Sequence, residues 1–181
     1  MTSSDGRPPA RLDRATAFAI DLGWGALAVL AATLLAFGWL FVRTDLGATH
    51  VTDGDSIIAA AVIGAAIPAW IGWVALHALT TGATRGQQRT GLRVEVTSAR
   101  PLARALRLAL HPISVPGWLW LAAVVAILEV PWLPLLVVLI GATIALMGVI
   151  SIALLITDPS AAPLHDRAAG TRVMRTPGPG R

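Results

Sequence analysis

The sequence contains no cysteine and no lysine, and charged residues of both signs are scarce. Without cysteine, the chain can form no disulfide framework, no thiolate metal site and no cysteine nucleophile. Charged residues make up 13% of the 181 residues, against about 25% in soluble globular proteins. Hydrophobic residues make up 55%, and the mean hydropathy is +0.70. This composition predicts an integral membrane protein.

Long apolar runs dominate the rest of the chain. A helix of ~20 apolar residues, rising ~1.5 Å per residue, crosses a hydrocarbon core of ~30 Å. The last apolar region, 113–156, is about twice as long as one crossing requires, and Glu129, Pro131 and Pro134 divide it. Trp70, toward the end of the second run, is expected at the membrane interface, which favours indole rings. We therefore predict an all-α membrane protein with four transmembrane helices, at about 16–42, 57–79, 114–129 and 134–156.

The main polar stretch is 80–112, which we predict to be a cytoplasmic loop. It contains one acid, Glu95, and six arginines: Arg85, Arg89, Arg93, Arg100, Arg104 and Arg107. Leu92–Val96 alternates apolar and polar residues, which indicates a short strand, and we predict that it pairs with 171–174 as a two-stranded ribbon. Pro101–Leu110 is predicted as a short interfacial amphipathic helix, which places the last three of these arginines on lipid phosphates.

The distribution of arginine predicts the orientation in the membrane. Segments rich in arginine stay in the cytoplasm. The residues before the first run, the loop 80–112 and the segment after Thr157 each hold several arginines, whereas 43–56 is poor in them. Both ends of the chain are therefore expected in the cytoplasm. Basic residues that are all arginine, with abundant alanine and glycine, are typical of a GC-rich bacterial genome, so we expect the inner (plasma) membrane of a bacterium.

Asp21 is the most informative single residue, because it lies inside the first apolar run. A carboxylate there costs several kcal/mol unless it faces protein or water. Arg14 lies two helical turns upstream on the same face, and Gly25 and Ala32 continue that face with small residues that permit close helix packing. Two interpretations stay open: Asp21 belongs to a fixed polar network with Arg14 or a loop arginine, or it binds a cation or carries a proton.

Three motifs resemble the RDD family of bacterial integral membrane proteins, which is named for one arginine and two aspartates. Their counterparts here are Arg14, Asp21 and Asp166. Asp166 lies in Leu164–Val173, which is similar to the family's His-Asp…Ala-Gly-Thr-x-Val motif and contains Gly170. The residues 82–94 resemble the family's Gly-x-Thr-x-Gly-Lys…Gly-Leu-Arg-Val loop, and its glycines correspond to Gly82, Gly86 and Gly91.

The resemblance covers roughly 12–174. We therefore predict an RDD-like membrane domain at 10–174 between two disordered tails, 1–9 and 175–181. The sequence departs from the family at Gln87, where the family has lysine, and Arg85 or Arg89 is the candidate to replace that charge. The resemblance implies transport of ions or small solutes.

The sequence provides little indication of a metal site, a phosphate-binding loop or a catalytic site. His165 next to Asp166 is too small a set for a metal site, which needs three or four ligands, and a helix cap or a salt bridge to a loop arginine is the default for Asp166. The glycine-rich loop at 82–88 lacks the Gly-Lys-Ser/Thr ending of a phosphate-binding loop. No catalytic triad order and no His-Glu-x-x-His motif occurs. We expect no enzyme activity, no metal, no cofactor and no nucleic-acid binding.

Two functions stay open. The first is a small ion or solute transporter that uses Asp21, as a homo-oligomer or with a partner membrane protein, because four helices enclose little space. The alternative is a non-enzymatic membrane adaptor or scaffold, whose arginine-rich cytoplasmic face binds anionic lipid headgroups or a partner protein.

Overall fold

The computed structural model describes residues 10–47, 49–97, 102–129, 132–158 and 162–176. The predicted N-terminal tail, Arg100 and most of the predicted C-terminal tail lie outside these residues.

The apolar runs form helices. Three are long and apolar enough to cross a membrane: α1 (Arg11–Arg43), α2 (Asp53–Thr81) and α6 (Leu133–Thr157). The crossing predicted at 114–129 corresponds to α5 (Val115–Ile127), a helix that rises only about 20 Å. A 3₁₀ turn, η1 (Pro112–Ser114), joins α5 to α4 (Ala103–Leu110), and this pair is bent by 65°. The described residues therefore contain three candidate spans, or four if the bent pair is one span.

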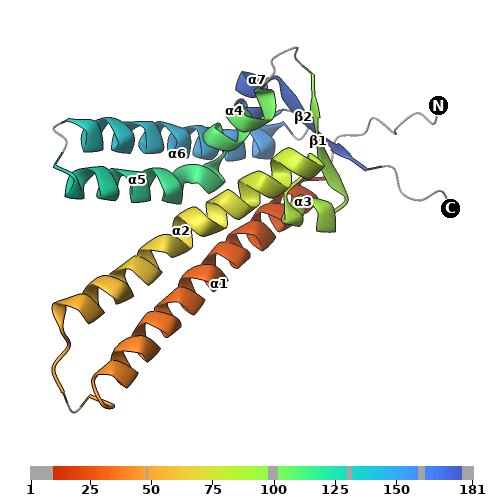
Figure 1. The fold of residues 1–181 in the computed structure, drawn as a ribbon. Coiled ribbons are helices and arrows are strands. Elements are labelled where there is room, and N and C mark those ends of the chain that lie inside the picture. Colours follow the sequence, from red (N-terminus) through yellow and green to blue (C-terminus); the bar gives the residue numbers. More distant parts are fainter. Residues whose placement is uncertain (1–9, 48, 98–101, 130–131, 159–161, 177–181) are drawn as a thin grey trace.

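The helices associate in two pairs, α1 with α2 and α5 with α6, which meet at one end of the molecule and diverge from there (Figure 1). Small residues bring α1 and α2 together. A Cβ atom on Gly25 would lie 2.6 Å from the indole of Trp70, so only glycine leaves room for that ring. Trp70 is thus buried between the helices, and its predicted position at the membrane interface stays a prediction.

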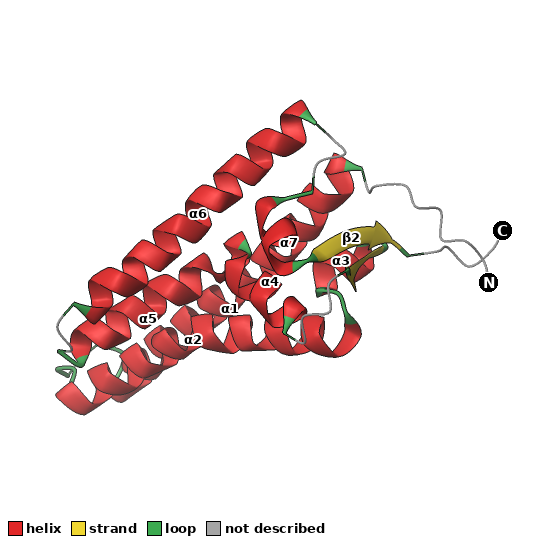
Figure 2. Ribbon diagram, turned by 90° about the horizontal axis from the view of Figure 1, so that it is seen from above, coloured by secondary structure: helices red, strands yellow, loops and turns green. Residues whose placement is uncertain are grey.

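Short elements gather where the two helix pairs meet, and we call them the polar cap: α3 (Arg85–Arg89), β1 (Leu92–Val96), α4, α7 (Leu164–Ala169) and β2 (Thr171–Arg175). Figure 2 shows the small sheet beside α3 and α7. β1 and β2 are antiparallel, with Val94 opposite Val173, which confirms the predicted two-stranded ribbon. β2 extends to Arg175, one residue into the predicted tail.

The polar cap is fastened to both helix pairs. Leu92, Val94 and Val173 of the sheet form a hydrophobic cluster with Ala17 of α1. The Nη2 atom of Arg11 donates a hydrogen bond to the backbone oxygen of Ile156, 2.8 Å away, which joins the start of α1 to the end of α6. The starts and ends of these helices are therefore fixed relative to the side chains of the cap.

Candidate functional site

Asp21 lies on α1 at the underside of the polar cap, and its side chain is buried, with 3% of the residue exposed. One carboxylate oxygen accepts a hydrogen bond from the Gly86 backbone N–H, 2.8 Å away. The other accepts one from the Thr84 hydroxyl. Among the described residues, no cationic side chain lies within salt-bridge distance of Asp21. The carboxylate is therefore solvated by neutral donors alone.

The loop that supplies these donors is built by its own sequence. Thr84 is the N-cap of α3, and its hydroxyl accepts from the Gln87 backbone N–H. The Thr84 backbone N–H in turn donates a hydrogen bond to the Gln87 side-chain Oε1 at 2.9 Å, which completes a capping box. A Cβ atom at Gly86 would lie 2.0 Å from the backbone oxygen of Ala17, so α3 approaches α1 this closely only with glycine. Gln87, the departure from the family pattern, thus caps α3 through its amide.

Trp70 completes the contacts of Asp21. Its indole Nε1 donates to the backbone oxygen of Asp21 at 3.2 Å. The sequence analysis missed both Thr84 and Trp70 as neighbours of Asp21. The Thr84-x-x-Gln87 pattern is itself a readable helix-start signal, whereas the contact with Trp70 depends on how α2 packs on α1.

The second family aspartate, Asp166 on α7, lies in a separate cluster. The Arg107 Nε donates to its Oδ1 at 2.6 Å, and the Thr171 hydroxyl donates to the same oxygen at 3.2 Å. Both charged side chains are almost fully buried, with 4% of Arg107 and 1% of Asp166 exposed. The predicted salt bridge from Asp166 to a loop arginine is present, but the prediction that Arg107 lies on lipid phosphates is wrong, because this pairing draws it into the cap.

Arg14 belongs to the Asp166 cluster and not to Asp21. Its guanidinium lies within electrostatic range of Asp166 and Arg107, and it forms no salt bridge with Asp21. Its Nε and Nη1 atoms are buried, and no hydrogen-bond partner for them exists within the described part of the chain. Of the three family-signature residues, Arg14 and Asp166 thus interact electrostatically, whereas Asp21 accepts its hydrogen bonds from Thr84 and Gly86.

His165 is buried beside this cluster. Burial lowers the pKa of its imidazole to about 4, although the neighbouring Asp166 carboxylate acts in the opposite direction. Its ring packs edge-on against the ring of His111, with 4.6 Å between the centroids. No group of three metal-ligating side chains occurs in the described ranges. His165 is therefore a neutral packing residue near pH 7.

The remaining predicted residues divide into exposed arginines and turn glycines. Arg85, Arg89, Arg93 and Arg104 are exposed on the polar cap. The Arg93 guanidinium pairs with Glu95. Three motif glycines have positive φ angles and lie at turns of the cap: Gly82 (77°), Gly91 (66°) and Gly170 (66°). Gly82 ends α2, as expected for the tight turn that leaves the second span.

Apolar helices of membrane-spanning length, with a polar cap that buries two aspartates, define a multi-pass helical membrane protein. The RDD family model matches residues 8–170, and the chain belongs to the RDD family. The match confirms the resemblance on which the three signature residues were assigned. No curated protein and no solved structure matches the chain.

Proposed function

We propose that this RDD family protein is a small cation or solute transporter of the bacterial inner membrane, with Asp21 as its coupling group. The observation that carries this proposal is the surroundings of Asp21: a buried carboxylate on a membrane helix, held by neutral donors and without a paired cation. Intramembrane ionisable residues commonly mark ion pathways and proton relays. The electrostatic energy of an unpaired carboxylate falls when it takes up a proton or a cation.

A change at Asp21 would reach the polar cap directly. Thr84 and Gly86, which donate to the carboxylate, are the N-cap and the second residue of α3. A proton or cation on Asp21 weakens the attraction between the carboxylate and these donors. The position of α3 against α1 therefore depends on what Asp21 binds, which is the kind of coupling that a transporter requires.

We propose that the polar cap faces the cytoplasm, which follows from its arginine content. The divergence of the two helix pairs leaves long apolar faces exposed. Lipid covers such faces, or a second copy of the chain does. We propose that a homo-oligomer or a partner membrane protein completes the pathway, because two helix pairs enclose little space.

Ion flux in proteoliposomes tests the proposal. Wild type, Asp21→Asn and Asp53→Asn are reconstituted at equal density, and dissipation of a pH gradient is followed with sodium, potassium and divalent cations. Asp53 is an exposed acid in the first turn of α2, and it controls for the loss of one carboxylate. We expect cation-dependent flux in wild type and Asp53→Asn, and background flux in Asp21→Asn. Undiminished flux through equally folded Asp21→Asn contradicts the proposal.

The exposed arginines favour a second candidate function, a membrane adaptor that binds anionic lipid or a partner protein through the polar cap. This function predicts that Arg85→Gln and Arg93→Gln matter more than Asp21→Asn. The measurement is recovery of a stoichiometric partner from the native membrane. Loss of that partner in the arginine variants alone supports the adaptor, whereas unchanged recovery contradicts it.

A further inference from the structure

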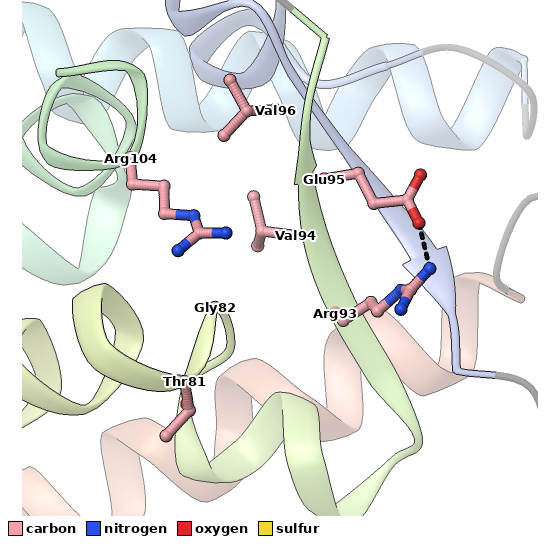
Figure 3. Close-up of a pocket in the computed structure, with 7 residues that line it drawn as sticks. All are labelled: Thr81, Gly82, Arg93, Val94, Glu95, Val96 and Arg104. Atoms are coloured by element: carbon pink, nitrogen blue, oxygen red, sulfur yellow. Dashed lines mark hydrogen bonds and ion pairs between the residues drawn. The ribbon is translucent and has the colours of Figure 1, made fainter. Parts of the chain in front are cut away.

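A cleft of about 480 Å³ opens on the polar cap between the end of α2, strand β1 and helix α4. Figure 3 shows its walls. Gly82 forms the end of α2, Val94 and Val96 come from β1, and Arg104 comes from α4. The cleft lies apart from Asp21 and Asp166, since neither lines it. The transport proposal does not use this cleft, and its Arg104 is one of the arginines that the sequence predicts to contact lipid phosphates.

Three charged residues line this cleft, Arg93, Glu95 and Arg104, and Arg104 is the one outside the Arg93–Glu95 ion pair. Its guanidinium points across the opening toward Gly82 and Val94 (Figure 3). A Cβ atom at Gly82 would lie 3.6 Å from its Nη2 atom, so the missing side chain leaves open space beside the cation. The structure gives Arg104 no hydrogen bond or ion pair with any residue that it describes. Its donors are free to bind a ligand.

The nearest acid does not neutralise Arg104. Glu95 pairs with Arg93, and Figure 3 shows this pair on the opposite side of β1 from Arg104. Side chains alternate between the two faces of a strand, so Val94 and Val96 point toward Arg104 while Arg93 and Glu95 point away. The lining therefore combines the Arg93–Glu95 ion pair, the valine side chains of β1 and the Arg104 guanidinium, with which Glu95 forms no ion pair.

The edge of β1 adds a backbone donor. Thr97 N–H bonds to Gly170 and Thr176 N–H bonds to Gly91, which places the odd-numbered residues of β1 in the ladder with β2. The even-numbered residues therefore turn their backbone groups to the other edge. The Val94 N–H is bound there by the Gly82 oxygen at 2.9 Å, which fixes β1 to the end of α2. The Val96 N–H faces the same edge, where the cleft opens.

We propose that this cleft binds a phosphate group, which the Arg104 guanidinium and the edge of β1 hold together. A guanidinium binds phosphate oxygens through parallel N–H bonds. The cleft begins where the membrane helix α2 ends, and Leu102 and Leu106 are exposed beside it. Phosphate at this level is available from a phospholipid headgroup or from a soluble phosphate compound. The site is independent of transport through Asp21.

Two measurements distinguish a phospholipid headgroup from a soluble phosphate compound: retention of lipid by the protein, and stabilisation of the protein by inorganic phosphate. The full-length protein in detergent is titrated with dioleoylphosphatidylglycerol, and retained lipid is counted by native mass spectrometry. Dioleoylphosphatidylcholine serves as the zwitterionic comparison. In parallel, the thermal unfolding midpoint is measured with inorganic phosphate. The variants are Arg104→Gln, Arg104→Lys and the control Arg89→Gln, which removes an exposed arginine of the cap outside the cleft.

We expect Arg104→Gln to weaken binding about tenfold, the loss typical of one charge-assisted hydrogen-bonding group. Arg104→Lys keeps the charge without the planar fork, so its loss should be smaller. Arg89→Gln should bind as wild type does. A loss of phosphatidylglycerol retention identifies a lipid headgroup, and a loss of protection by inorganic phosphate alone identifies a soluble source. The proposal is overturned if Arg104→Gln changes neither, or if Arg89→Gln weakens binding equally.

Discussion

Asp21 and Asp166 are both buried carboxylates of the polar cap, yet their surroundings differ in one respect. Asp166 bonds to a buried arginine, and a second arginine lies within electrostatic range. Asp21 accepts hydrogen bonds from a hydroxyl and a backbone N–H, and Arg107 lies within its electrostatic range without forming an ion pair with it in the described part of the chain. Breaking a buried ion pair leaves one charge uncompensated. A carboxylate that accepts hydrogen bonds only from neutral groups can take up a proton without leaving a buried cation unpaired. This difference supports the proposal of a structural role for Asp166 and of proton or cation exchange at Asp21.

The largest expected effect comes from breaking the Asp166 pair. Asp166→Asn leaves Arg107 without a countercharge, which should lower the free energy of unfolding by about 3–5 kcal/mol. Asp13→Asn, which removes a partly exposed pair with Arg175, should cost at most about 1 kcal/mol. Thermal unfolding in detergent measures both changes.

A paired replacement sharpens this prediction. Arg107→Met combined with Asp166→Leu removes both charges, and an apolar pair of similar volume often substitutes for a buried salt bridge without loss. The double variant should therefore be more stable than Asp166→Asn. If the double variant is no more stable than the single one, the lost charge pairing does not explain the effect.

Gly86→Ala tests the close approach that supplies a donor to Asp21. The new Cβ atom would meet the Ala17 oxygen at 2.0 Å, so α3 must shift. Overpacking of this kind should cost about 1–3 kcal/mol. Gly23→Ala on the same helix as Asp21 has nothing within 4 Å and is the control, expected to be neutral or slightly stabilising. Equal unfolding midpoints for the two variants would show that α3 does not rest on α1.

Thr84→Val should have a smaller effect, because it removes one helix cap and one donor to Asp21. Loss of an N-cap hydroxyl costs about 1 kcal/mol. Thr84→Ser retains the hydroxyl and should restore both stability and ion flux. Flux that is lost in Thr84→Ser as well as in Thr84→Val argues against a role for the hydroxyl.

The smallest expected effect concerns pH. The pKa of His165 is lowered to about 4 by burial, from about 6.5 in the unfolded chain. The unfolded state therefore binds more protons between these values, so stability is complete above pH 6.5 and falls as the pH drops toward 4. The expected loss at pH 5.5 is roughly 1 kcal/mol. His165→Gln should weaken this dependence without removing it, because burial also lowers the pKa of the neighbouring His111. His50→Gln, at an exposed position, should leave it unchanged.

Sequence patterns predicted the elements well where the signal is local. Apolar runs indicated the long helices, and alternation in Leu92–Val96 indicated β1 and its pairing with the C-terminal strand. Each of these signals is a property of a short segment, so no tertiary information was needed. The family match over residues 8–170 includes Asp21 and Asp166, whose roles stay predictions.

Which side chains meet was harder to predict, because the cap folds segments from distant parts of the chain together. Arg14 lies seven positions from Asp21, but its guanidinium lies near Asp166 instead. Arg107 has the spacing of an exposed helix face, and its pairing with Asp166 buries it. The break at Pro112 also shortens α5, because η1 and the 65° bend separate it from α4. The spacing of residues along a helix predicts which side chains share a face, but it does not predict which part of the chain packs against that face.

Labelling with a carbodiimide compares the two aspartates most directly. Such reagents attack carboxyl groups in their protonated form, and a bound cation protects the group. The reconstituted wild type is labelled with and without sodium, potassium or a divalent cation, and modified peptides are quantified by mass spectrometry. We predict that Asp21 is modified and that the cation protects it, while Asp166 stays unmodified. Equal modification of both aspartates, or modification of Asp166 alone, would contradict the assignment of exchange to Asp21.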